Sequence, residues 1–283
     1  MGRSGYPLVE HSPWPLITST LAFSSVMSVL LLFHDADSSS FFYNFNHEVW
    51  PFCYSLFFLG LCLMGWWGDV VYEGVYLGRH TSLVVKNFRM GFRMFILSEV
   101  FFFVSFFWAF LHVKIGELSC KFEWPPMGIQ GVYPGGLPLW NTALLVSSAG
   151  FVTLAHKYII AYNKAYLKSS DFYVMRSESL KWLGVTVILG AMFVACQAYE
   201  YYICPFCISD GAFGSCFFVM TGFHGLHVMA GIIFLSVAFG RLYNCHFSKS
   251  MNMFNVTAAI WYWHFVDVVW ILLMILVYCS IYF

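Results

Sequence analysis

One acidic side chain lies inside a long apolar stretch of the sequence. Residues 96–110 read ILSEVFFFVSFFWAF, and Glu99 is the only ionisable group among them. In a helix, its neighbours three and four positions away are Phe95, Ile96, Phe102 and Phe103. A charge at the centre of a membrane helix costs roughly 2.5–3.5 kcal/mol. We therefore expect Glu99 to be either a neutral acid that hydrogen bonds to another helix for packing, or a proton-linked or partner-coupled group.

Two histidines lie in a second apolar stretch, TGFHGLHVMAG at residues 221–231. His224 and His227 are three positions apart, so in a helix they share a face. Two imidazoles at this spacing can bind a metal ion, but a metal site needs more ligands nearby, and this stretch supplies none. We favour hydrogen bonds between helices as the role of both histidines.

A third polar pair lies in WYWHFVDVVW, residues 261–270. His264 and Asp267 again have the spacing that puts two side chains on one helix face. An imidazole beside a carboxyl group can share a hydrogen bond with it and so offset the burial of both groups. We interpret these two residues, like the two histidines above, as structural polar groups.

Polar residues and thiols also meet near the end of another apolar run. Gln197 and Glu200 are placed there to cap a helix or to bind a neighbouring segment. Cys204 and Cys207, in the sequence CPFC, are the only tightly spaced pair among nine cysteines, whose odd number argues against a disulfide framework. We interpret the pair as two unlinked thiols, with a disulfide or a metal site as the alternative.

Several kinds of catalytic centre are excluded by the sequence. It has no Glu-x-x-His pair for a carboxylate-bridged di-iron centre, no glycine-rich phosphate loop and no nucleophile elbow. No lysine lies in the interior of an apolar run, away from its ends, which argues against a retinal Schiff base, and the scattered histidines offer no axial pair for a haem. We expect no catalytic residue, no metal ion and no redox centre in this chain.

The composition indicates that a lipid bilayer surrounds these groups. The chain has 283 residues, of which 60% are hydrophobic and 10% are charged, and its mean hydropathy is +0.72. Soluble domains have about 25% charged residues. Runs of about 20 apolar residues, the length that spans a bilayer, lie near 15–34, 50–71, 92–113, 137–160, 181–203, 213–240 and 257–281. We predict an all-α integral membrane protein with seven transmembrane helices in one domain, 1–283.

The basic residues predict its orientation. Of the 14 Lys and Arg residues, 12 fall in segments on one side of the predicted spans, and only Lys114 and Lys121 fall on the other. Lys and Arg collect in cytoplasm-like loops, so we expect the N-terminus inside and the C-terminus outside. We interpret the first residues, MGRSGYPLVEHSPWPL, as neither a secretory signal nor a transit peptide.

Seven stretches together resemble one known family, cytochrome c oxidase subunit III of the haem-copper oxidases. They occur in the order found in that family and extend over nearly the whole chain. They are SPWPL (12–16), WWGDVVYEG (66–74), ILSEVFFFVSFFWAFLH (96–112), WPPMGI (124–129), NTALLVSSA (141–149), TGFHGLHV (221–228) and WYWHFVDVVW (261–270).

The resemblance implies a two-helix part, 1–75, and a five-helix part, 76–283, separated by a lipid-filled V-shaped cleft. It implies a multi-pass protein of the mitochondrial inner membrane whose N-terminus faces the matrix. The implied partners are catalytic subunit I with haem a, haem a3 and copper, copper-bearing subunit II, accessory subunits and bound phospholipids, with cytochrome c as substrate of the complex and no nucleic acid. This non-catalytic subunit would stabilise the catalytic subunit and support proton uptake in a complex that reduces O2 and pumps protons.

The resemblance also implies roles for single residues. Glu99 matches a buried acid beside the cleft, near the interface with the catalytic subunit. Positions around one phospholipid are matched by Trp67, Glu73, His80 and Ser98, and positions around another by Trp108, His112 and Arg241. The chain departs from the family pattern at Gly68 and Tyr72, where the family usually has arginine, so two cationic partners for headgroups are absent. It also departs at NMFNVT (252–257), where an inner-surface histidine pair and an acid are missing.

Two further classes of function stay open from the residues alone. A proton-linked transporter would use Glu99 and the two histidines of 221–231, although such proteins often have internal repeats or broken helices that are not evident here. A purely structural scaffold would lose nothing but stability when Glu99 is neutralised.

Overall fold

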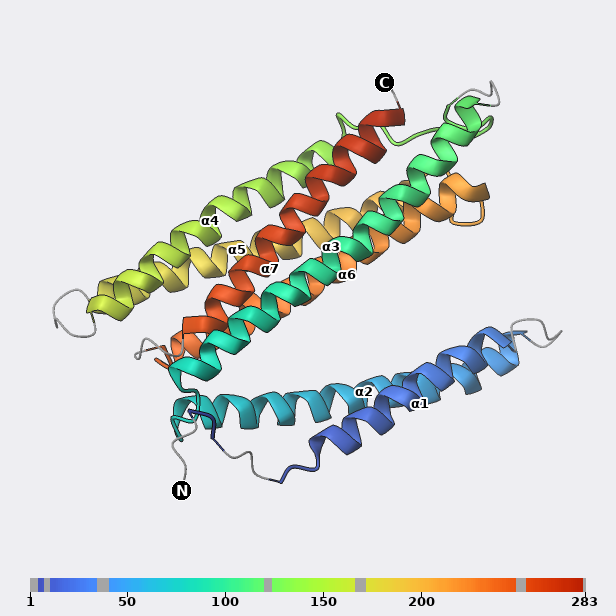
Figure 1. Cartoon of the computed structure of the whole chain (residues 1–283). Helices are drawn as coiled ribbons and strands as arrows, with labels where there is room; N and C mark the ends of the chain where they lie inside the picture. The colour runs from blue at the N-terminus through green and yellow to red at the C-terminus, as the bar shows by residue number, and fades with distance from the viewer. Residues whose placement is uncertain are drawn as a thin grey trace. The chain divides into compact units, whose positions relative to one another are not determined.

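Seven long helices make up the computed structural model, which describes residues 5–7, 11–34, 41–119, 124–165, 172–247 and 253–281. The helices are α1 (Trp14–His34), α2 (Phe41–Val75), α3 (Ser82–Ser119), α4 (Leu137–Ala165), α5 (Phe172–Ile203), α6 (Gly211–Tyr243) and α7 (Phe254–Leu273). A π-helical turn, η3 (Met274–Tyr278), and a 3-10 turn, η4 (Cys279–Ile281), extend α7 (Figure 1). No strand occurs in these ranges, and the predicted all-α fold is confirmed.

All seven helices are long and apolar enough to cross a membrane. In hydrocarbon every backbone N–H and C=O must find a partner within the protein, and an α-helix supplies these partners within one segment. Several helices are longer than their apolar runs; α3 has 38 residues, whereas the run that predicted it covers 92–113. The outward surface is apolar too, as the exposed Phe101, Trp108 and Met64 illustrate. These features fit a protein whose solvent is lipid.

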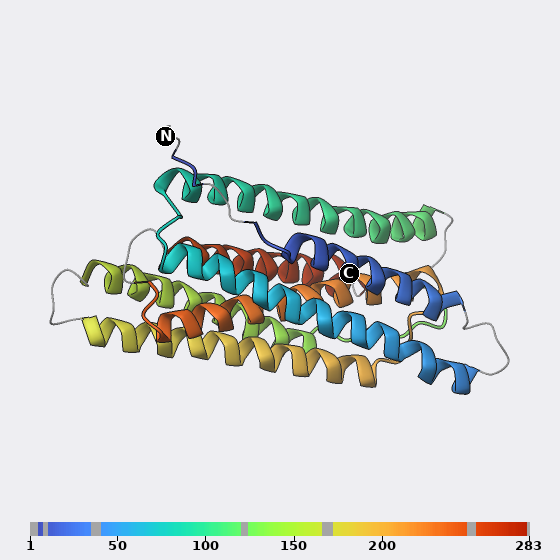
Figure 2. The same ribbon diagram turned by 90° about the horizontal axis from the view of Figure 1, so that it is seen from below.

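The chain divides into two compact units, Met1–Val84 and Val85–Phe283. In the first unit α1 and α2 run side by side in both views (Figures 1 and 2). The indole Nε1 of Trp14 donates a hydrogen bond to Asp69 Oδ2 at 2.6 Å. The same indole lies against Gly65, where an added Cβ would stand 2.6 Å from the ring. A glycine on one helix thus accommodates the largest side chain of the other.

In the second unit α7 is the most buried helix. Half of the apolar segment with which this helix would cross the membrane is buried inside the protein, a larger share than for any other span of the described chain. It runs alongside α4 and α6 (Figure 1). Trp263 and Trp270 of α7 are fully buried, and each indole donates a hydrogen bond to a hydroxyl group of α4. The bonds are Trp263 Nε1 to Ser148 Oγ, 2.9 Å, and Trp270 Nε1 to Thr142 Oγ1, 3.0 Å.

Trp263 brings four helices together. Its six-membered ring lies between Gly190 of α5 and Gly231 of α6, where added Cβ atoms would stand 2.6 and 2.8 Å from ring carbons. Its nitrogen reaches Ser148 of α4. Without a hydrophobic driving force between helices in lipid, close packing and hydrogen bonds must hold them together. This indole provides both.

The packing around Trp263 predicts that alanine at two glycines of α6 lowers the stability of the protein by different amounts. Gly231→Ala would force a methyl group against the indole, and such overpacking costs about 1–3 kcal/mol. Gly222→Ala would make only an ordinary contact, with the Tyr201 hydroxyl at 3.9 Å. We expect Gly231→Ala to lower the thermal unfolding midpoint of the detergent-solubilised protein clearly more than Gly222→Ala does. Equal midpoints for the two variants would contradict the packing described here.

Candidate functional site

Glu99 has a partner on another helix. Its Oε2 lies 2.9 Å from Nε2 of His227, which joins α3 to α6. The two helices are antiparallel, because Phe106 of α3 contacts Phe223 and Phe110 contacts Phe213, further back along α6. A polar role is expected for each residue from its place in an apolar stretch, and the structure brings the two together.

The contact of the second ring nitrogen of His227, Nδ1, shows which atoms of the pair carry hydrogen. Nδ1 of His227 lies 2.7 Å from the carbonyl oxygen of Phe223, and a carbonyl only accepts hydrogen bonds, so Nδ1 bears a hydrogen. The contact between Nε2 and Glu99 Oε2 then holds one proton. It belongs either to a neutral carboxyl group or to an imidazolium ion paired with a carboxylate. In both states the pair is neutral overall, so its burial costs far less than that of a lone charge.

Aromatic rings surround this pair. The ring centroid of His227 lies 5.0 Å from that of Phe103 and 6.3 Å from that of Tyr262, in a stacked arrangement with the latter. The side chains of His227 and Glu99 are 15% and 21% exposed, so one side of the pair is open at the surface of the chain. The arrangement can store or exchange one proton at a surface that is otherwise apolar.

The other histidine of the predicted pair has a different environment. His224 is 1% exposed, and its Nε2 donates to the carbonyl oxygen of Val266 at 3.2 Å, which ties α6 to α7. Its ring stacks at a tilt on Trp270, with centroids 5.2 Å apart. His224 therefore has the contacts of a packing residue.

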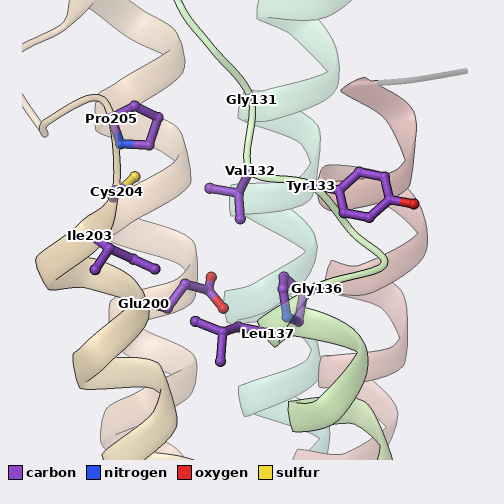
Figure 3. Close-up of a pocket in the computed structure, with 10 residues that line it drawn as sticks. Gly131, Val132, Tyr133, Gly136, Leu137, Glu200, Ile203, Cys204 and Pro205 are labelled. Atoms are coloured by element: carbon purple, nitrogen blue, oxygen red, sulfur yellow. The ribbon is translucent and has the colours of Figure 1, made fainter.

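A buried polar network lies at the end of α5, where Figure 3 shows Glu200 beside the 131–137 segment. Tyr278 donates its hydroxyl hydrogen to Glu200 Oε1 at 2.7 Å, and Gln197 Nε2 donates to the same oxygen at 3.4 Å. Asn141 of α4 in turn donates to Gln197 Oε1 at 3.4 Å. Glu200 is only 2% exposed. The network connects α4, α5 and the end of the last helix.

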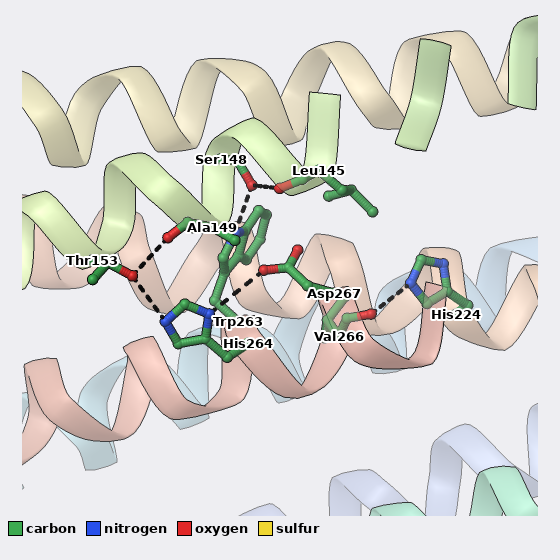
Figure 4. A network of polar contacts seen from close by, with 9 residues as sticks. All are labelled: Leu145, Ser148, Ala149, Thr153, His224, Trp263, His264, Val266 and Asp267. Carbon is green, nitrogen blue, oxygen red and sulfur yellow. Dashed lines mark hydrogen bonds and ion pairs between the residues drawn. The ribbon is translucent and has the colours of Figure 1, made fainter. Parts of the chain in front are cut away.

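The hydrogen bond expected between His264 and Asp267 is not formed. His264 Nδ1 lies 3.8 Å from Asp267 Oδ2 (Figure 4), which is an ion-pair contact and longer than a hydrogen bond. Nε2 of His264 instead lies 3.4 Å from Thr153 Oγ1 of α4. Asp267 is 5% exposed, and neither of its oxygens has a hydrogen-bond partner among the described residues.

Three of the residues expected at one phospholipid lie in the first unit. Trp67 is 52% exposed. Glu73 forms an ion pair with Arg79 at 3.9 Å, and the ring of His80 lies against Gly74, where an added Cβ would stand 2.5 Å from Nδ1. The fourth, Ser98, belongs to the second unit, is exposed and donates its hydroxyl hydrogen to the Phe95 carbonyl at 2.6 Å.

The residues expected at the other phospholipid do not lie together. Trp108 and His112 are exposed on α3, toward its C-terminal end. Arg241 is 9% exposed near the C-terminal end of α6, with its guanidinium 5.0 Å from the centroid of the Phe247 ring. Counted from the Glu99–His227 contact, the antiparallel helices put His112 and Arg241 about 40 Å apart at about 1.5 Å per residue. One headgroup cannot contact both ends.

Thiols and metal ligands add no further centre in the described part of the chain. No group of three or more His, Cys, Asp or Glu side chains lies close enough to hold a metal ion there. Cys204 and Cys207 are free thiols in this structure. Burial raises the pKa of the Cys204 thiol, and the charge of Glu200 raises it further. Hydrogen bonds from Cys207 hold the pKa of the exposed Asp210 carboxyl group below its usual range.

Sequence reasoning missed two features of this region. It treated Glu99 and the histidines of 221–231 separately, because nothing in one sequence indicates that α3 lies beside α6. It also gave Glu200 little weight, since Tyr278 and Asn141, which belong to the same hydrogen-bond network, are distant in the chain. The exposure of a polar residue at a helix end is decided by its neighbours in space.

Comparisons with known proteins agree with this architecture along the whole chain. A model of the family described as "Cytochrome c oxidase subunit III" matches residues 4–282. Proteins named "Cytochrome c oxidase subunit 3" from Lumbricus terrestris and Drosophila melanogaster are 42% and 43% identical to it, over 281 and 284 residues. These matches include 98% of this chain in both cases, and 98% and 97% of the relatives. A third protein of that name, from Branchiostoma lanceolatum, is 41% identical over 277 residues, 96% of this chain and 95% of the relative.

Seven membrane-spanning helices, the polar residues held between them and a match from residue 4 to residue 282 all lead to one family. The chain belongs to the cytochrome c oxidase subunit III family, a non-catalytic subunit of that proton-pumping oxidase.

Proposed function

We propose that this chain assembles as subunit III of an aa3-type cytochrome c oxidase in the mitochondrial inner membrane, with its N-terminus in the matrix. Its partners would be a catalytic subunit that holds haem a, haem a3 and copper, and a copper-bearing subunit that receives electrons from cytochrome c. The near-complete match to relatives named for this subunit supports the assignment. The distribution of the basic residues supports the orientation.

The Glu99–His227 pair is the observation on which a specific role rests. It holds one proton between two helices, and it is partly exposed on the apolar surface of the second unit. Polar groups at membrane depth are rare, because lipid solvates them poorly. We propose that this surface faces the catalytic subunit, and that the pair supports proton uptake there and protects that subunit from inactivation during turnover.

Phospholipids are the second part of the proposal. Arg241 is nearly buried, and its Nε has no hydrogen-bond partner among the described residues. A guanidinium group with a free donor is well suited to a phosphate. We propose that Arg241 binds a headgroup at one end of α6, and that Trp108 and His112 bind a different lipid at the other end. Trp67, Glu73, His80 and Ser98 stay proposed headgroup contacts.

Assembly can be tested by native separation of mildly solubilised membranes. We expect this chain, identified by mass spectrometry, to migrate with haem a absorbance and with cytochrome c oxidation activity. A haem-free band of low mass would overturn the assignment, and proton flux through the isolated chain in liposomes would then favour a transporter.

Replacing the acid tests the role of the pair during turnover. Glu99→Gln keeps the side-chain volume but removes the exchangeable proton. We expect the complex to assemble in normal amount and to lose activity severalfold faster during continuous turnover. Ser105→Ala, an exposed change on the same helix, is the matched control and should leave the inactivation rate unchanged. Unchanged inactivation in Glu99→Gln would reduce Glu99 to a packing residue.

A double-mutant cycle tests whether Glu99 and His227 act as one unit. Residues in direct contact show coupling energies of about 0.5–3 kcal/mol. We expect His227→Gln to accelerate inactivation about as much as Glu99→Gln, and the double variant to be no faster than either. If the inactivation rate of the double variant rose by the product of the two single increases, the two side chains would act separately. His224→Gln, which disrupts a packing contact with α7, should lower stability without reproducing the turnover effect.

A further inference from the structure

A cavity lies beside Glu200, away from the Glu99–His227 pair. Its volume is about 270 Å³, and it opens between the end of α5 and the segment that leads into α4. Its walls are mostly apolar, and the described residues that line it are Gly131, Val132, Tyr133, Gly136, Leu137, Pro138, Glu200, Ile203, Cys204 and Pro205. In Figure 3 the Glu200 carboxyl group points from α5 toward Leu137 and Gly136 across this space.

The two oxygens of this carboxyl group differ. Oε1 accepts hydrogen bonds from the Tyr278 hydroxyl and from the Gln197 amide. Oε2 is buried and has no hydrogen-bond partner among the described residues. Burial of Glu200 favours the neutral acid, whereas the two donors directed at Oε1 favour the carboxylate, as would a cation bound nearby. Glu200 thus lines the cavity with a carboxyl group whose Oε2 is left without a partner among the described residues.

A carboxylate at Glu200 has no counter-charge among the described residues that line the cavity. None of these ten residues is Lys, Arg or His. A buried charge without a counter-charge is strongly unfavourable. A primary ammonium group supplies positive charge and three hydrogen-bond donors, and a short carbon chain attached to it would contact Val132, Leu137 and Ile203. A volume of 270 Å³ admits a small group, since drug-sized ligands need about 300–1,000 Å³.

We propose that this cavity binds a primary ammonium group, from a free small amine or from the headgroup of an aminophospholipid, with Glu200 Oε2 as its counter-charge. The proposal stands apart from the assignment to the oxidase. It concerns residues at the end of α5 for which the sequence suggested only a capping or neighbour-binding role.

Cys204 provides a reporter inside the cavity. It lines the space, and the negative charge of Glu200 raises the pKa of its thiol beyond the effect of burial. An ammonium ion bound at Glu200 would cancel that charge, so the midpoint of Cys204 alkylation would move to lower pH. The bound amine would also obstruct access and lower the maximal alkylation rate. Cys207 is exposed and does not line the cavity, which makes it an internal control three residues away.

The experiment measures iodoacetamide alkylation of Cys204 and Cys207 against pH by peptide mass spectrometry. It uses the intact complex in nanodiscs that contain only phosphatidylcholine, and ethanolamine is the probe. We expect ethanolamine to shift the Cys204 midpoint to lower pH and to reduce its maximal rate severalfold, with Cys207 unchanged. Choline, which has no N–H donor, should have neither effect. No response of Cys204 to ethanolamine, or an equal response of Cys207, would overturn the proposal.

Two variants test the charge of Glu200 and the volume of the cavity separately. Glu200→Gln should show the lowered midpoint without any amine and should not respond to ethanolamine; a response like that of the unmodified protein would overturn the proposal. Val132→Phe fills the cavity while Glu200 keeps its charge, so the midpoint should stay high and ethanolamine should have no effect. If Glu200→Gln does not assemble, Val132→Phe alone tests the proposal. An effect of ethanolamine on Cys204 alkylation that persists in Val132→Phe would mean that the amine binds outside this cavity.

The source of the amine is distinguished by the lipid. Nanodiscs with phosphatidylethanolamine and no free amine should reproduce the midpoint shift if a headgroup occupies the cavity. A shift with ethanolamine alone would identify a soluble amine instead.

Discussion

The contact of one indole with two glycines and a serine holds together four of the five helices of the second unit, α4 to α7. Trp263 of α7 lies between Gly190 and Gly231, and its nitrogen is satisfied by Ser148. In lipid, helices gain little from hiding apolar surface, so shape and hydrogen bonds decide which helices associate. Because one residue meets α4, α5 and α6 at once, their spacing is fixed around it. The polar pairs of the unit depend on that spacing.

The polar groups of the second unit fall into two kinds. Glu99 and His227 satisfy each other, whereas His224 bonds to a backbone carbonyl through Nε2 and has no described partner for Nδ1. Asp267 has two oxygens without partners, and Glu200 has one. Unsatisfied buried groups are costly, and proteins retain few of them without a reason. Hydrogen-bonded pairs such as Glu99 and His227 hold neighbouring helices together. Buried oxygens without a partner mark places that a bound group would complete, as we propose for an ammonium group beside Glu200.

Much of the fold was predictable from the sequence, because hydrocarbon imposes a simple rule on the backbone. The rule requires about 20 apolar residues per span, and all seven predicted spans are present as helices. The helix ends were less predictable: α3 begins at Ser82, well before its apolar run. Spatial pairs such as Glu99 with His227 depend on which helices are neighbours. The same limit explains why Arg241 was grouped with Trp108 and His112, although the helix register separates them.

The Glu99–His227 pair has an electrical consequence. Its proton moves only between Oε2 and Nε2, which lie 2.9 Å apart. A membrane potential does work only on charge displaced along the bilayer normal, about 2.3 kcal/mol per charge and 100 mV for a full crossing. A full crossing of the hydrocarbon is about 30 Å, so exchange of the shared proton over so short a distance gains at most about 0.2 kcal/mol per 100 mV. Its position is thus set by local contacts and stays nearly independent of how strongly the membrane is energised.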